Sequence, residues 1–93
     1  MRERTIEKYL RERVKAARGW APKWNSPGNN GVPDRIVFLP GGRVAYVELK
    51  APGKKATALQ QVQHERLRGL GQDVRVIDSR EDVDALIREM TGV

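Results

Sequence analysis

The feature that most constrains this fold is a short link near the middle of the chain. Residues 34–39 (DRIVFL) and 43–50 (RVAYVELK) both have the apolar and β-branched composition of strands, and only Pro40-Gly41-Gly42 separates them. Because three residues are too few for a parallel crossover, the two strands must form an antiparallel hairpin. A hairpin centred near residue 41 pairs position 34 with about position 48. The sequence therefore predicts that Asp34 and Glu48 lie side by side.

The second strand of this hairpin is predicted to be central in its sheet. Side chains alternate along a strand. One face therefore carries Val44, Tyr46, Glu48 and Lys50, and the other carries Ala45, Val47 and Leu49. Both faces begin apolar, which is typical of a strand covered on both sides. Charged groups at the end of such a strand are partly desolvated, and this is costly unless they have partners.

Two carboxylates and an ammonium group are thus predicted to converge at one end of the hairpin. Asp34 and Glu48 suit a hard divalent cation, because Mg²⁺ prefers carboxylate, water and phosphate oxygens. Such a cation polarises a phosphate and activates water, and Lys50 can orient that water or stabilise developing charge. In the simpler interpretation, Asp34 caps a turn and Glu48 forms a surface ion pair of little energetic value with Lys50. The combination of Pro33-Asp34, the hairpin length and the Glu-x-Lys spacing favours the metal site.

The segments before the hairpin predict one helix, one short strand and a loop. Apolar residues recur at three- and four-residue intervals over residues 3–18, which indicates an amphipathic helix that ends at Gly19. Residues 20–25 (WAPKWN) are read as a strand, which Pro22 would confine to a sheet edge or to the strand's start. Residues 26–33 (SPGNNGVP) are rich in proline and glycine and indicate a loop with tight turns.

The segments after the hairpin predict a helix, a third core strand and a last helix. Thr57 caps a helix to about residue 70, whose inward face is expected to carry Leu59, Val62, Leu67 and Leu70. A strand covers residues 73–78, and Ser79 caps a helix with the apolar stripe Val83, Leu86, Ile87 and Met90. The helix between two strands makes a right-handed parallel crossover. The predicted fold is therefore α/β, in the order α-β-β-β-α-β-α with a mixed sheet.

Length, charge and residue usage narrow the functional class. Ninety-three residues predict one domain with one modest core, and the formal charge of +6 is typical of proteins that meet polyanions. The sequence has no cysteine and one histidine, which excludes a disulfide scaffold, thiol catalysis and a multi-histidine metal site. The apolar runs are too short for a membrane helix, and residues 1–10 show no secretory signal. We expect a cytoplasmic protein with no membrane association.

The order Glu7, Pro33-Asp34 and Glu48-Leu49-Lys50 resembles the PD-(D/E)XK nuclease superfamily. The wider string from Ser26 to Gln60, followed by HERLRGLG and VRVIDS, resembles the stand-alone VRR-NUC domain (virus-type replication-repair nuclease). The resemblance implies a restriction-endonuclease-like α-β-β-β-α-β core with a mixed central sheet flanked by helices, plus a C-terminal helix. It also implies a phosphodiesterase that depends on Mg²⁺ or Mn²⁺ and needs no organic cofactor.

The resemblance assigns roles to particular residues. Asp34 and Glu48 would bind the metal with the Leu49 carbonyl, and Lys50 would serve the attacking water. Gln60 matches the glutamine that the family places near the site, although Gln61 and Gln63 lie close in sequence. Glu7 is the expected acid of the first helix, and Glu3, one turn away, is its rival. His64, one turn after Gln60, is expected to serve packing or DNA contact rather than catalysis.

Candidate DNA contacts surround this predicted site. The loop over residues 26–31 can offer backbone N–H groups to a phosphate, with Ser26 and Asn29 as side-chain contacts. Basic residues on adjacent segments are further phosphate contacts: Lys23, Arg35, Lys54 and Lys55. Trp20 and Trp24 are expected to serve core or dimer packing more than base stacking.

The acid pair and Lys50 predict metal-dependent hydrolysis of phosphodiesters, and the resemblance implies an endonuclease that acts on branched or flapped DNA in phage or bacterial replication and repair. The resemblance also implies a homodimer, and a two-fold dimer would place two sites on the two strands of a Holliday junction. The alternatives are a catalytically silent nucleic-acid-binding module and a subunit that is active only within a larger replication-repair complex.

Overall fold

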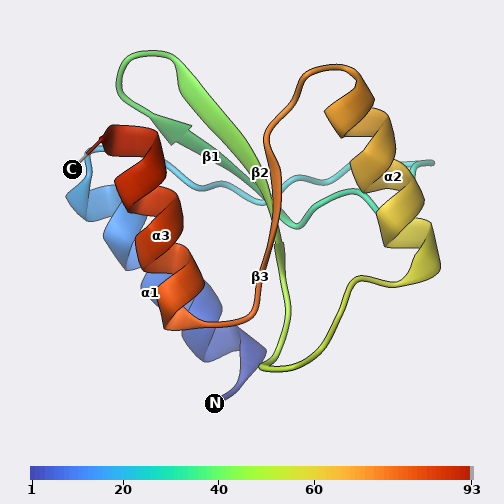
Figure 1. Ribbon diagram of the computed structural model, residues 1–93, viewed down its shortest axis with the longest axis horizontal. Coiled ribbons are helices and arrows are strands. Elements are labelled where there is room, and N and C mark those ends of the chain that lie inside the picture. Colours follow the sequence, from blue (N-terminus) through green and yellow to red (C-terminus); the bar gives the residue numbers. More distant parts are fainter. Residues whose placement is uncertain (93) are drawn as a thin grey trace.

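The computed structural model describes residues 1–92 of the chain. They form helices and strands in the order α1 (Glu3–Ala16), β1 (Arg35–Leu39), β2 (Arg43–Leu49), α2 (Ala58–Gly69), β3 (Val74–Ile77) and α3 (Arg80–Thr91) (Figure 1). The sheet order is β1-β2-β3, with β2 antiparallel to β1 and parallel to β3. The predicted α/β class, the mixed sheet and the central position of β2 are confirmed.

The β1–β2 hairpin has the predicted register. Arg35 pairs with Val47 and Leu39 pairs with Arg43, so the pairing continues toward Asp34 and Glu48 at the open end. Gly41 and Gly42 in the turn have φ angles of 88° and 76°. Glycine adopts these left-handed angles without the steric penalty that a side chain brings, which explains why the link can be so short.

The prediction of a regular strand over residues 20–25 is wrong. This segment runs antiparallel to β1 but forms only two isolated bridges, Trp20 with Phe38 and Lys23 with Arg35. Its bonds to β1 include a pair between the backbones of Trp20 and Phe38, at 2.9 and 2.8 Å. Pro22 accepts from the Ile36 N–H but has no N–H of its own, so it interrupts the ladder. The observed order is therefore α-β-β-α-β-α.

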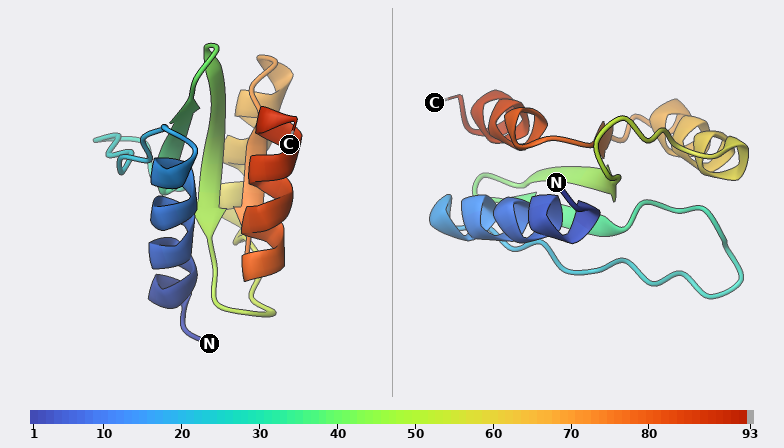
Figure 2. Two further views of the ribbon diagram at one scale, coloured as in Figure 1. Left: turned by 90° about the vertical axis from the view of Figure 1, so that its left-hand side faces the viewer. Right: turned by 90° about the horizontal axis from the view of Figure 1, so that it is seen from below.

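The helices cover both faces of the sheet. Figures 1 and 2 show α1 and α3 side by side on one face and α2 on the opposite face. Among the described residues, no helix has the length and apolar character needed to cross a membrane.

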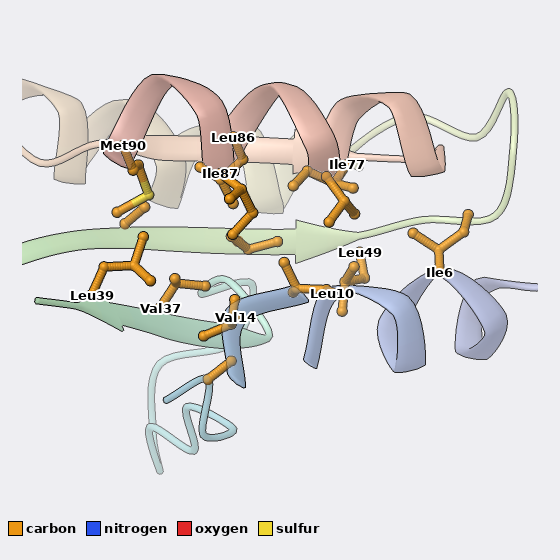
Figure 3. Packing of buried hydrophobic residues seen from close by; sticks show 14 residues of the cluster. Ile6, Leu10, Val14, Val37, Leu39, Leu49, Ile77, Leu86, Ile87 and Met90 are labelled. Carbon is orange, nitrogen blue, oxygen red and sulfur yellow. The ribbon is translucent and has the colours of Figure 1, made fainter. Parts of the chain in front are cut away.

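The main core lies between the sheet and the pair of helices α1 and α3. Figure 3 shows buried side chains from both helices meeting β1, β2 and β3. Fully buried members include Ile6, Leu10, Val14, Val37, Ala45, Val47, Val83 and Leu86. Burying one such aliphatic side chain contributes about 1.5–3 kcal/mol. The predicted apolar stripes of the first and last helices are thus confirmed. Because these two helices cover one face of the sheet, the opposite face is left for α2.

The prediction for the inward face of α2 is wrong in part. Leu59, Val62 and Leu70 are 51%, 64% and 72% exposed, whereas His64 is buried. The helix is rotated so that polar side chains face the sheet, because Glu48 on β2 requires polar partners there. The predicted Thr57 cap is confirmed, since the Thr57 hydroxyl accepts a hydrogen bond from the Gln60 N–H at 3.2 Å.

Candidate active site

Asp34 and Glu48 meet at the open end of the hairpin, as their spacing predicts. Asp34 immediately precedes β1, and Glu48 is the penultimate residue of β2. The backbone N–H of Leu49 donates to Asp34 Oδ2 at 2.8 Å, which fixes the Asp34 carboxylate against the end of β2. The hairpin register therefore brings together two acids from opposite ends of one hairpin.

The Glu48 carboxyl lies in an environment that disfavours its negative charge. Only 2% of the Glu48 surface is exposed to solvent. Burial raises the pKa of Glu48 to about 8, and the negative charge of the neighbouring Asp34 adds to the rise. Lys50 opposes this rise, and Glu3 adds a smaller upward contribution. Two neighbouring carboxyl groups with one of them buried form a site that a cation would stabilise.

One side chain that directly follows β2 and two side chains of α2 surround the Glu48 carboxyl. Lys50 Nζ lies 3.8 Å from Oε2, and the Gln60 side-chain amide donates to the same oxygen at 3.1 Å. His64 Nε2 lies 3.8 Å from Oε1. The structure therefore brings Lys50 and Gln60 to Glu48. Two of the three side chains around the carboxyl, Gln60 and His64, come from α2.

The structure distinguishes the three candidate glutamines by position. The Gln60 Oε1 accepts from the Thr57 N–H at 2.9 Å, which leaves its NH₂ group directed at Glu48. Gln61 donates to the Ala56 carbonyl and Gln63 donates to the Asn30 carbonyl, each at 3.0 Å. The capping of α2 thus selects Gln60 as the glutamine at the site.

His64, which the sequence analysis expected to serve packing or DNA contact, lies beside the Glu48 carboxyl. It is 1% exposed and faces Glu48 from α2. Burial lowers the pKa of His64, and the positive charges of Arg68 and Lys50 lower it further. Its spacing of four residues from Gln60, on the same helical face, was the available signal. His64 is therefore part of the wall of the site rather than of the hydrophobic core.

Glu7 and Glu3 of α1 lie at the rim of the same site. Glu7 Oε2 accepts from Arg35 Nε at 3.2 Å, whereas Glu3 acts on Glu48 through its charge. Both acids line a pocket of about 470 Å³ together with Arg4, Lys23, Trp24, Asn25, Val32, Asp34 and Leu49. The pocket is open to solvent beside Asp34, and it has room for a phosphate group next to the acids.

Comparison with known proteins identifies the family. No family model matches the sequence. A solved structure described as a VRR_NUC domain superposes with a TM-score of 0.86 at 38% identity, covering 92% of this chain and 94% of that one. A protein named "Putative nuclease p44", from Acyrthosiphon pisum secondary endosymbiont phage 1, is 49% identical over 81 residues, which is 87% of each chain. The chain belongs to the VRR-NUC family of nucleases.

The candidate site of this VRR-NUC domain offers some, but not all, of the oxygen ligands that a divalent cation requires. Glu48 Oε1 is buried and has no hydrogen-bond partner among the described residues, so it can accept a ligand without losing a bond. Asp34 and the Leu49 carbonyl are the other oxygen donors expected from the sequence. Within residues 1–92, no group of three or more His, Cys, Asp or Glu side chains could hold a metal ion. Waters and substrate oxygens would therefore have to complete the coordination.

Five of the residues expected to contact DNA lie on the surface or in the loop before Asp34. Lys23, Lys54 and Lys55 are exposed, and Lys23 lines the pocket beside Asp34. The Asn29 side chain donates to Ser26 Oγ at 3.3 Å, within the loop that precedes Asp34.

Arg35 does not suit a direct phosphate contact. It is 7% exposed, and its guanidinium donates to Glu7 and, at 2.6 Å, to the Ala21 carbonyl. Its charge is therefore already paired inside the fold, and this part of the sequence prediction is corrected.

Proposed function

We propose that this nuclease is a Mg²⁺- or Mn²⁺-dependent DNA endonuclease that acts on branched DNA in phage or bacterial replication and repair. The observation that carries the proposal is the convergence of Asp34, Glu48 and Lys50 at the end of β2, where the buried Oε1 of Glu48 has no hydrogen-bond partner within residues 1–92. A buried polar atom without a hydrogen bond is costly, and groups with strongly perturbed pKa values are concentrated at functional sites. The phage origin of the similar nuclease supports the biological setting.

Each residue of the site has a defined role in this proposal. Asp34, Glu48 and the Leu49 carbonyl would hold the cation, which supplies Lewis-acid polarisation of the scissile phosphate. Gln60 holds Glu48 Oε2 in place through its hydrogen bond. The Lys50 ammonium, 3.8 Å from the same oxygen, can orient the attacking water and stabilise developing negative charge. Glu7 or Glu3 would complete the acidic rim from α1.

The basic residues around the pocket would hold the DNA backbone. Lys23 lies at the pocket wall, and Lys54 and Lys55 project from the loop that follows β2. Ser26 and Asn29 present a polar loop before Asp34. Contacts of this kind position phosphates without reading sequence, which agrees with an enzyme that selects DNA shape.

A homodimer would explain selection of a four-way junction. Two copies related by a two-fold axis would present two sites to two strands of a two-fold symmetric junction. The small core of a chain of 93 residues also gains from association. We place this activity in the bacterial cytoplasm, where phage DNA is replicated.

A second candidate is a nucleic-acid-binding module without catalysis of its own. The observation that favours it is the small acidic set, because the described residues hold no cluster of three or more metal-binding side chains. A subunit that gains activity from a partner protein fits the same observation.

One cleavage experiment separates these functions. The wild-type protein is incubated with plasmid, linear duplex, forked duplex and a four-way junction, in Mg²⁺, in Mn²⁺ or in EDTA. Faster cleavage of the fork or junction with either cation, and none in EDTA, supports the proposal. Cleavage that persists in EDTA contradicts the metal dependence. Binding without cleavage in both cations favours the silent module, and equal rates on all substrates reject branch selectivity.

A further inference from the structure

A basic stripe runs along the exposed side of α1, away from its core face. Arg4, Lys8, Arg11 and Lys15 recur at spacings of four, three and four residues, which places them on one side of the helix. The stripe spans about 16 Å, because an α-helix rises about 1.5 Å per residue.

The stripe lies beside a groove that is separate from the pocket at Asp34. This groove has a volume of about 660 Å³ and lies between α1 and the segment that follows it. It is lined by Lys8, Arg11, Glu12, Lys15, Gly19, Trp20, Ala21, Pro22 and Arg35. Glu12 is the acid of the lining, and it pairs weakly with Lys8 at 3.9 Å on the surface. Although Glu7 neutralises Arg35, the groove lining still carries the three cations Lys8, Arg11 and Lys15 against the one carboxylate of Glu12, so positive charge dominates.

The groove adjoins the pocket at Asp34, although the two share no lining residue. Arg4 lines the pocket at Asp34, whereas the next three cations of the stripe line the groove. The ion pair between Glu7 and Arg35 joins the two, since Glu7 lines the pocket and Arg35 lines the groove. A strand that leaves the pocket along α1 therefore meets successive positive charges.

An exposed aromatic pair lies at the border of the groove. Trp20 is 68% exposed and stacks on Phe38 with 5.9 Å between ring centroids. Stacking on one neighbour leaves most of the Trp20 surface open. A basic groove beside an open aromatic ring is the combination that binds single-stranded DNA, because phosphates follow the charges and bases stack on the ring. Repulsion among the same cations opposes the docking of a second copy on this groove.

We infer that the groove between α1 and residues 19–22 binds an unpaired DNA strand that leaves the active site, through Lys8, Arg11 and Lys15 and by base stacking on Trp20. The inference rests on the proposed function, because it assigns the single-stranded arm of a branched substrate to a place on the enzyme. It adds a binding site outside the catalytic pocket.

The groove is tested by measuring DNA binding in a variant that should not cleave DNA. The full chain carries Glu48→Gln, and the probes are a fluorescent oligothymidine of about 15 nucleotides and a blunt duplex. Arg11→Gln with Lys15→Gln removes two charges from the groove. Arg66→Gln with Arg88→Gln removes two exposed charges from α2 and α3 and serves as the matched control.

The groove variant should bind the single strand about tenfold more weakly at low salt, with a salt slope reduced by about 1.4, whereas the control should change much less. Trp20→Leu should weaken single-strand binding about fivefold or more and leave duplex binding nearly unchanged. Equal affinity and slope in the groove and control variants would overturn the inference. So would a loss of binding that follows a shift from dimer to monomer in sedimentation, which would make the groove an interface between copies.

The two proposals fail in different ways. If the wild type cleaves no DNA but the groove variant still loses single-strand affinity, the proposed function fails and the groove remains a binding site. If the wild type cleaves branched DNA and the groove variant binds and cleaves as the control does, the groove inference fails alone.

Discussion

The buried Oε1 of Glu48 lies 3.8 Å from the buried Nε2 of His64, and neither atom has a hydrogen-bond partner among the described residues. This distance is too long for a hydrogen bond. Gln60 and Lys50 hold the other carboxylate oxygen, so Oε1 remains available to a ligand. His64 shapes the wall against which that oxygen is held.

Replacing His64 should therefore impair catalysis more than DNA binding. His64→Ala leaves space beside Glu48, and loss of such supporting residues typically costs 10–100-fold in activity or metal affinity. We expect a fall in kcat of about that size with little change in DNA affinity, and partial rescue by His64→Gln. Val62→Ala, on the exposed face of α2, is the control. Wild-type kcat in a folded His64→Ala protein would exclude the role.

Replacing Glu48 should separate cleavage from binding. Glu48→Gln keeps the shape of the side chain but removes a proposed metal ligand and a negative charge. Cleavage should fall on the order of a hundredfold or more, and DNA binding should be unchanged or stronger. Glu65→Gln makes the same change at an exposed position of α2 and should have wild-type activity. Unchanged turnover in Glu48→Gln would show that Glu48 is not a ligand.

The raised pKa of Glu48 predicts how stability depends on pH. The folded state holds the proton to about pH 8, whereas the unfolded chain releases it near pH 4.5. The stability that this proton contributes is complete below pH 4.5 and is lost as the pH rises through about 8. In EDTA, the free energy of unfolding should therefore fall between pH 6.5 and 8, by up to about 1.4 kcal/mol per pH unit.

Urea unfolding at several pH values in this window measures the effect. In the folded state the lowered pKa of His64 lies below this window, whereas in the unfolded chain His64 still titrates near its ordinary value of 6.5. Its contribution therefore opposes that of Glu48 at the lower edge of the window and fades toward pH 8. Glu48→Gln should flatten the curve. A wild-type curve that is already flat from pH 6.5 to 8 would refute the expected shift.

Divalent cations should stabilise the folded protein through the same acids. Binding to the folded state alone adds about 2.7 kcal/mol when the cation is at about 100 times its dissociation constant. Mg²⁺ or Mn²⁺ at pH 8 should raise the melting temperature of the wild type but not of Asp34→Asn. Glu81→Gln, at an exposed position of α3, should keep the response. An equal response in Asp34→Asn would place the bound cation elsewhere.

Lys54 and Lys55 should contribute phosphate contacts near the site. Changing both to Ala should weaken duplex binding and reduce the salt slope by up to about 1.8, which corresponds to two contacts. Fluorescence anisotropy at several salt concentrations gives the slope. Arg66→Ala with Arg88→Ala removes the same charge and is the control. A slope identical to wild type would show that these lysines do not contact DNA.

The hairpin and its pair of acids could be predicted from the sequence because the information is local. A link of three residues permits only antiparallel pairing, and the register then follows from the position of the turn. The alternating pattern of β2 likewise predicted a central strand, which the neighbours β1 and β3 confirm. The caps Thr57 and Ser79 were visible because their side chains bond within their own helices.

The sequence predictions were wrong where the structure of a segment depends on the element packed against it. Residues 20–25 have a strand-like composition, but Pro22 lacks the N–H needed to continue a ladder with β1. Leu59, Val62 and Leu70 have helical periodicity, yet the buried Glu48 draws the polar face of α2 onto the sheet.

The sequence by itself determined the α/β class, the hairpin register and the meeting of Asp34 with Glu48, because each depends on short-range geometry and on the alternation of side chains. Only the tertiary structure decided that Gln60 and His64 face Glu48 and that Arg35 is paired with Glu7. These relationships depend on how a helix is rotated against the sheet, and that rotation is set by burial and charge contributed by distant parts of the chain.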